Sequence, residues 1–127
     1  MATFRPTRES VCKLNFDDKF YYELPLNEET IRNIAKIAEK QQKFLSELNN
    51  TDSETFNKAY NASLDALDEI LGEGAGADIM SLYDKPDLFS IVEVITYISE
   101  EFNAAYSEKL NSMKATGTVP SVSRGRR

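Results

Sequence analysis

Few side chains in this chain could carry out chemistry. Histidine is absent, which removes Ser-His and Cys-His nucleophile pairs and every metal site that uses an imidazole. The one cysteine, Cys12, has no second thiol with which to form an internal disulfide or a thiolate zinc site, and it alternates with apolar positions as a buried strand residue does. There is also no P-loop and no glycine-rich dinucleotide motif. The sequence therefore predicts a protein that binds another protein, is not an enzyme, and uses no cofactor and no metal.

An acidic cluster is the remaining candidate for cation chemistry. Asp65, Asp68 and Glu69 share one face of a predicted helix, at spacings of three and four residues. Such a cluster can bind a cation or a partner, but no calcium-loop pattern accompanies it. We expect an ordinary solvated helix face, and a binding role stays open.

Three glycines at alternate positions form a predicted corner: Gly72, Gly74 and Gly76. Gly72 follows an apolar helical stripe and is expected to end that helix in a left-handed conformation. Glu73 would face any bound phosphate, so the corner is expected to be structural.

The charge is unevenly distributed. The chain has 15 basic and 21 acidic residues, a net charge of −6, and no acidic residue follows Met113. The acidic body repels phosphate, so we expect no nucleic-acid partner. The most apolar stretch, residues 88–98, is too short to span a bilayer, and the first residues do not resemble a signal peptide. We therefore expect no membrane partner and a cytoplasmic location.

The elements that must position these residues begin with a β-hairpin. Residues 1–10 are polar and are expected to be a flexible lead-in. Two alternating runs then surround the short turn at residues 17–19. The inward positions are predicted to be Cys12, Leu14, Phe16, Phe20, Tyr22 and Leu24.

Three long helices and one short helix are predicted to follow. The first starts at the cap Asn27 and ends near residues 49–50, with Gln41 as a polar gap in its apolar stripe. The second starts at Thr51, which has capping-box spacing to Glu54, and ends at Gly72. The apolar stripes are Ile31, Ile34, Ala38, Leu45 and Leu48 in the first helix, and Phe56, Tyr60, Leu64, Leu67 and Leu71 in the second.

The short helix is predicted at residues 77–83 and the last long helix at residues 86–113. The stripe of the last helix is Leu88, Ile91, Ile95, Ile98, Phe102, Ala105 or Tyr106, and Met113. Residues 114–127 lose the helical period and read as a disordered basic tail. Residues 11–113 thus form one mainly α-helical domain with an N-terminal hairpin.

Some apolar residues of the last helix lie off its main stripe. Phe89, Val94 and Tyr97 exceed what so small a bundle is expected to cover, and Leu82 and Tyr83 lie just before them. Apolar residues at helical spacing are more often core, and that alternative stays open. As a hypothesis, these five residues contact a partner.

A resemblance gives this hypothesis a context. The run Asp-Glu-Ile-Leu-Gly-Glu-Gly-Ala at residues 68–75 is followed by a short apolar stretch, a polar break and a long helix that carries Glu100 and Glu101. This order resembles the tail assembly chaperones of long-tailed bacteriophages that infect Gram-positive bacteria. The resemblance covers roughly residues 11–113, and its most specific part is the Leu-Gly-Glu-Gly-Ala turn. The arginine-rich end is not part of the resemblance.

The resemblance implies a non-enzymatic role in an infected bacterium. Such proteins bind the long tape-measure protein, help to recruit tail tube subunits, and are absent from the finished virion. Many are also made in a longer frameshifted form, and self-association is compatible with the role. The alternative is a small acidic inhibitor that mimics nucleic acid to block a DNA- or RNA-binding enzyme. The lysines mixed among the acidic residues, such as Lys36, Lys40 and Lys43, count against that alternative.

Overall fold

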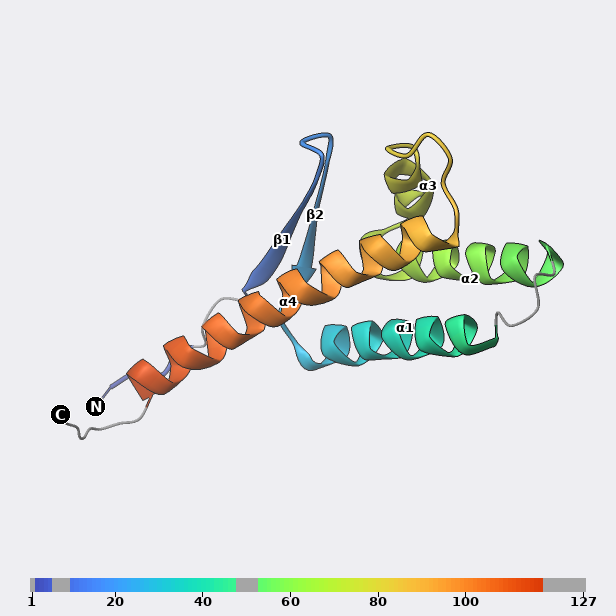
Figure 1. Ribbon diagram of the computed structural model, residues 1–127. Helices are drawn as coiled ribbons and strands as arrows, with labels where there is room; N and C mark the ends of the chain where they lie inside the picture. Colours follow the sequence, from blue (N-terminus) through green and yellow to red (C-terminus); the bar gives the residue numbers. More distant parts are fainter. Residues whose placement is uncertain (1, 6–9, 48–52, 118–127) are drawn as a thin grey trace.

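The computed structural model describes residues 2–5, 10–47 and 53–117, and this part of the protein is mainly helical. Within these residues a two-stranded hairpin precedes four helices (Figure 1). The elements are β1 (Val11–Phe16), β2 (Phe20–Pro25), α1 (Glu28–Glu47), α2 (Ser53–Leu71), α3 (Ala75–Met80) and α4 (Leu88–Gly117). The predicted fold class is therefore confirmed in outline.

The hairpin has the predicted alternation. β1 and β2 pair antiparallel with Leu14 opposite Tyr22, and every second side chain of β1 is buried. In the connecting turn Asp17 and Asp18 have φ values of 57° and 56°, a conformation that aspartate tolerates better than most residues. The Asn15 side chain fixes this turn, because its Nδ2 donates to Asp18 Oδ1 at 2.9 Å and its Oδ1 accepts from the Asp18 N–H at 2.8 Å.

Helix α1 begins as predicted but buries a different line of residues. Asn27 caps the helix, since its Oδ1 accepts the Thr30 N–H at 2.9 Å. Gln41, the predicted polar interruption of the stripe, lies on the buried face: it is 6% exposed and donates from Nε2 to Ser63 Oγ on α2 at 2.7 Å. Its Oε1 is buried and has no hydrogen-bond partner among the described residues. Leu45, predicted to be in the stripe, is 38% exposed. Residues 48–50 lie outside the described residues.

The corner after α2 contains glycines of two kinds. Gly72 and Gly74 have φ values of 116° and 86°, so the positive φ expected for Gly72 is confirmed. Gly76 is buried in α3, where a Cβ would lie 3.0 Å from the backbone oxygen of Leu64. The Gly76 N–H donates to Asp68 Oδ1 at 2.8 Å, which links α3 to α2. The capping residue predicted for α2, Thr51, lies outside the described residues.

The ends of the last two helices differ from the prediction. Helix α3 covers Ala75–Met80 instead of residues 77–83, so Leu82 and Tyr83 lie in the turn that follows it. Helix α4 starts at Leu88, two residues later than predicted, because Asp87 Oδ1 accepts the Ser90 N–H at 3.0 Å. It also continues past Met113 to Gly117, so the tail was predicted four residues too early. Residues 118–127 lie outside the described residues.

Helix α4 is the element on which the others assemble. In Figure 1 the hairpin lies on one side of α4, while α1 and α2 lie on the other, and α4 contacts β1, α1 and α2. Its fully buried residues include Ile91 and Ile98, as its apolar periodicity predicts. The C-terminal part of α4 extends past the start of α1 (Figure 1). One helix thus presents different faces to two groups of neighbours.

Candidate functional site

A groove opens between the hairpin, the turn after α3, and α4. It has a volume of about 190 Å³. We call it the hairpin groove, and its lining residues are Asn15, Phe16, Asp17, Leu82, Tyr83, Glu93, Val94 and Tyr97. Four of the five residues predicted to contact a partner are therefore brought together in one place.

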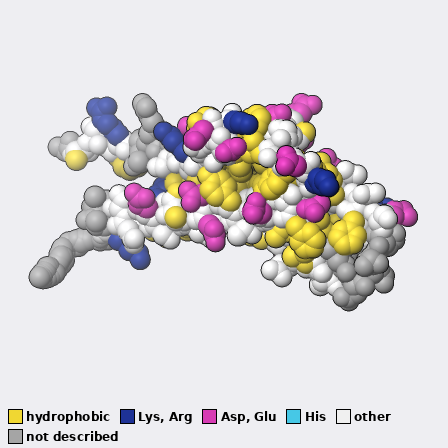
Figure 2. Space-filling model, turned by 45° about the horizontal axis from the view of Figure 1, so that its top comes forward, with side chains coloured by type: hydrophobic (Ala, Val, Ile, Leu, Met, Phe, Trp, Pro, Cys, Tyr) yellow, Lys and Arg dark blue, Asp and Glu magenta, His cyan; other side chains and the backbone are white. Residues whose placement is uncertain are grey.

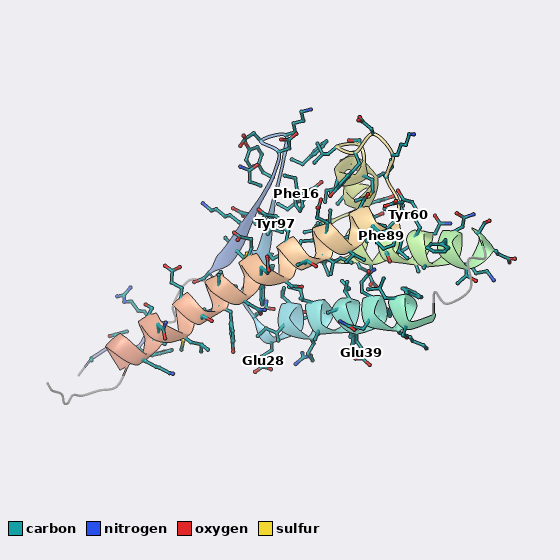
Figure 3. The ribbon with its side chains drawn as sticks, in the orientation of Figure 1. Phe16, Glu28, Glu39, Tyr60, Phe89 and Tyr97 are labelled. Carbon is teal, nitrogen blue, oxygen red and sulfur yellow. The ribbon has the colours of Figure 1, made fainter. Side chains whose placement is uncertain are left out.

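Tyr97 builds the groove by joining the hairpin to α4. Its ring packs edge-on against Phe16 with the ring centres 5.2 Å apart, and Figure 3 shows the two side chains pointing toward each other. Its hydroxyl accepts the Asn15 N–H and donates to the Asn15 carbonyl, both at 3.1 Å. The Tyr97 hydroxyl therefore satisfies both backbone groups of Asn15 on β1. In this way Tyr97 holds the hairpin in position against α4.

The other four predicted residues lie in different environments relative to the hairpin groove. Leu82 and Tyr83 are half-buried in the groove wall. Val94 was predicted to be exposed, and this is wrong: it is 4% exposed, because the hairpin covers its face of α4. Phe89 is 65% exposed, as predicted, but it does not line the hairpin groove. Figure 3 places Phe89 at the start of α4, away from Phe16 and Tyr97.

The hairpin groove is acidic. Asp17 and Glu93 are the charged members of the eight lining residues, and both are carboxylates. The Tyr83 hydroxyl donates to Glu93 Oε1. Burial, and then the hydrogen bond and charge of Glu93, raise the pKa of Tyr83 to about 12. The hydrogen bond from Tyr83 holds the Glu93 carboxylate at the groove.

Sequence reasoning missed Asn15, Asp17 and Glu93. Glu93 and Tyr97 are one helical turn apart, which is a detectable signal. The contact between the hairpin and α4 spans 82 residues of sequence, so no local pattern could reveal it. The acidic character of this groove follows from tertiary packing.

A second groove lies between α1 and α4, and we call it the α1–α4 groove. Its volume is about 320 Å³. None of its lining residues is charged: Ile31, Ile34, Ala35, Ala38, Ser99, Phe102, Asn103 and Tyr106. The rings of Phe102 and Tyr106 stack with their centres 6.4 Å apart. Ile34 and Phe102 are buried, as their positions in the apolar stripes predict, but an open groove beside them was not predicted.

The apolar surface continues along α4 beyond this groove. Leu110 and Met113 lie four and seven residues after Tyr106, on the same face, and are 39% and 57% exposed. On the hairpin side of the molecule, which Figure 2 turns forward, hydrophobic side chains also gather in the middle of the face, with acidic and basic side chains around them. Apolar surface bordered by charge is typical of a surface that binds another protein.

The acidic cluster and Cys12, which were the candidates for chemistry, line neither of these two grooves. Of the acidic cluster, Asp68 is engaged with Gly76 and Asp65 is exposed. Across the part of the chain that the structure describes, no group of three metal-binding side chains occurs. Cys12 is buried, and burial, together with the Glu101 charge, raises the pKa of its thiol and so disfavours the nucleophilic thiolate. The arrangement suits binding.

Comparison with known proteins finds no family model, no curated protein and no solved structure that this chain matches. In the described residues no helix has both the length and the apolar character needed to cross a membrane.

Proposed function

We propose that this protein is a tail assembly chaperone of a long-tailed bacteriophage, acting in the cytoplasm of the infected bacterium. In this role it binds the tape-measure protein, helps to recruit tail tube subunits, leaves before the virion is complete, and catalyses no reaction. The resemblance of residues 68–75 and of the element order supplies the family context.

The observation that carries the proposal is the uncharged α1–α4 groove and its continuation along α4. An amphipathic client helix can place its apolar stripe between two helices, and each buried side chain contributes roughly 1.5–3 kcal/mol. Ile31 and Tyr106 are half-buried and offer apolar contact without any charge to desolvate, while Phe102 lines the same groove from the core. Leu110 and Met113 lengthen the surface on α4, which suits a long helical client.

The alternative of a nucleic-acid mimic has less support. A mimic needs a continuous acidic face, yet Arg32 pairs with Glu28 at 3.5 Å and Lys58 pairs with Glu54 at 3.4 Å. Figure 3 shows Glu28 on the side of α1 that faces away from α4. Because Arg32 pairs with Glu28, a positive charge lies among the acidic residues of this outer surface. This mixture of signs weakens any phosphate-like pattern.

Co-expression with the tape-measure protein of the same phage tests the proposal. Ala35 lines the α1–α4 groove but is exposed, so Ala35→Glu adds a carboxylate there without burying it in the core. The matched control is Gln42→Glu, the same charge change at an exposed position of α1 outside the groove. We expect the wild type and Gln42→Glu to keep the client soluble, and Ala35→Glu to weaken client binding by about tenfold or more, because the client must then desolvate a charge.

The complex should also survive a few tenths molar salt, because salt screens surface charges much more than it weakens apolar contact. A client that stays soluble equally well with Ala35→Glu would contradict the assigned surface. Recovery of a nuclease or polymerase in place of the tape-measure protein, released by salt, would support the nucleic-acid mimic instead.

A further inference from the structure

The hairpin groove differs from the α1–α4 groove in its charge. Its apolar wall is formed by Leu82, Val94 and the Phe16 ring, while the carboxylates of Asp17 and Glu93 line the same hollow. Both bordering loops are acidic as well. The turn at residues 17–19 has two acidic residues and one basic residue, and so does the loop at residues 84–87.

Hydrogen bonds hold the turn that carries Asp17 and the carboxylate of Glu93. Asp17 belongs to a turn that two hydrogen bonds between Asn15 and Asp18 hold in shape. The Glu93 carboxylate accepts a hydrogen bond from the Tyr83 hydroxyl. Because this carboxylate and the turn that carries Asp17 are already ordered, less conformational entropy is lost when a cation binds beside the apolar hollow.

We propose that the hairpin groove binds a partner segment in which one large apolar side chain is flanked by lysine or arginine. The apolar side chain enters the hollow against the half-buried Leu82 and Tyr97, and the flanking cations lie against Asp17 and Glu93. This inference goes beyond the proposed function, because it assigns a second and separate surface with a different chemistry. Charge complementarity selects this occupant over an uncharged helix, which would leave both carboxylates partly desolvated and unpaired.

Two synthetic helical peptides provide the test. Each is about 20 residues long, enough for appreciable helix, and carries a central leucine. In one peptide the leucine is flanked by lysines, and in the other by glutamates at the same positions. Fluorescence anisotropy measures their binding to the full chain. We expect the basic peptide to bind at least about tenfold more tightly, since like charges across an interface repel.

A pair of charge-removing substitutions locates the effect. Asp17→Asn preserves the turn, because asparagine tolerates positive φ, and Glu93→Gln keeps an oxygen that accepts the Tyr83 hydroxyl. The double variant should bind the basic peptide roughly three- to tenfold more weakly, as expected for the loss of two partly exposed ion pairs. The control, Asp65→Asn with Glu108→Gln, changes the net charge equally at exposed sites outside the groove and should alter binding less than about twofold.

Equal binding of the two peptides, or equal weakening by the double variant and its control, would overturn the inference. So would occupation of the groove by a second copy of the chain, seen in sedimentation as a dimer that Asp17→Asn with Glu93→Gln dissociates. The chaperone proposal is tested separately by Ala35→Glu, so either idea can fail while the other stands.

Discussion

The two grooves share α4 but differ in how they are built and in what they can bind. The α1–α4 groove lies between two helices, and its uncharged lining comes from side chains at helical spacing. The hairpin groove is assembled from three separate segments of the chain, and it places Asp17 and Glu93 beside apolar walls. A single long helix can therefore present an apolar face to one partner and a partly acidic face to another.

The largest expected effect comes from Tyr97, which supports one groove and not the other. Tyr97→Ala removes a ring packed on Phe16 and both hydrogen bonds to Asn15. We expect a loss of about 2–4 kcal/mol in the free energy of unfolding, measured by urea denaturation, for a half-buried aromatic side chain. The basic peptide should bind much more weakly, while an uncharged amphipathic peptide should bind the α1–α4 groove within about twofold of the wild type.

Tyr97→Phe is the matched control, because it keeps the ring and removes the hydroxyl. Tyr97→Phe should lower the free energy of unfolding by about 1 kcal/mol, which is typical of hydrogen bonds lost at a partly exposed site. If Tyr97→Ala weakened both peptides equally, the two grooves would not be independent.

A smaller effect is expected at Gly76, which sets the position of α3 and so of the turn that carries Leu82. In Gly76→Ala the new Cβ would lie 3.0 Å from the Leu64 oxygen and 3.2 Å from Asp68 Oδ1. Because α3 must shift to relieve these contacts, we expect the free energy of unfolding to fall by about 1–2 kcal/mol. The basic peptide should also bind more weakly. Thermal denaturation measures the first effect and anisotropy the second. A melting temperature equal to that of the wild type would show that α3 is not held as closely to α2 as the structure has it.

The smallest effect is expected at Phe89, which lines neither groove. Phe89→Ser removes a side chain that is 65% exposed, so the free energy of unfolding should change by less than about 0.5 kcal/mol. The basic peptide and the uncharged amphipathic peptide should both bind as they do to the wild type. Weakening of either peptide in anisotropy would place Phe89 in a binding surface and would extend that groove toward the start of α4.

The sequence was most informative where local periodicity and local capping decide the structure. The alternation of Cys12, Leu14 and Phe16, the Asn27 cap and the positive φ of Gly72 were all predicted and are confirmed. Each depends on residues within a few positions of one another, and local chemistry is enough to specify them.

The errors occurred where a distant element changes the environment of a residue. Val94 is buried because the hairpin packs on its face of α4. Leu45, predicted to be in the stripe of α1, is exposed. The candidate site was found in part for the same reason. Apolar excess on the last helix pointed to Phe89, Val94 and Tyr97, and Leu82 and Tyr83 were added because they lie just before them. Asp17 joins the groove only through tertiary packing.

Simultaneous titration of one protein sample with both peptides tests the central claim most directly. The protein is saturated with the uncharged amphipathic peptide, and the basic peptide is then titrated in and followed by anisotropy. Two independent grooves predict that the basic peptide binds with unchanged affinity, that the first peptide stays bound, and that a few tenths molar salt weakens the basic peptide alone. Displacement of the first peptide by the second, or equal sensitivity of both to salt, would contradict the existence of two surfaces with different chemistry.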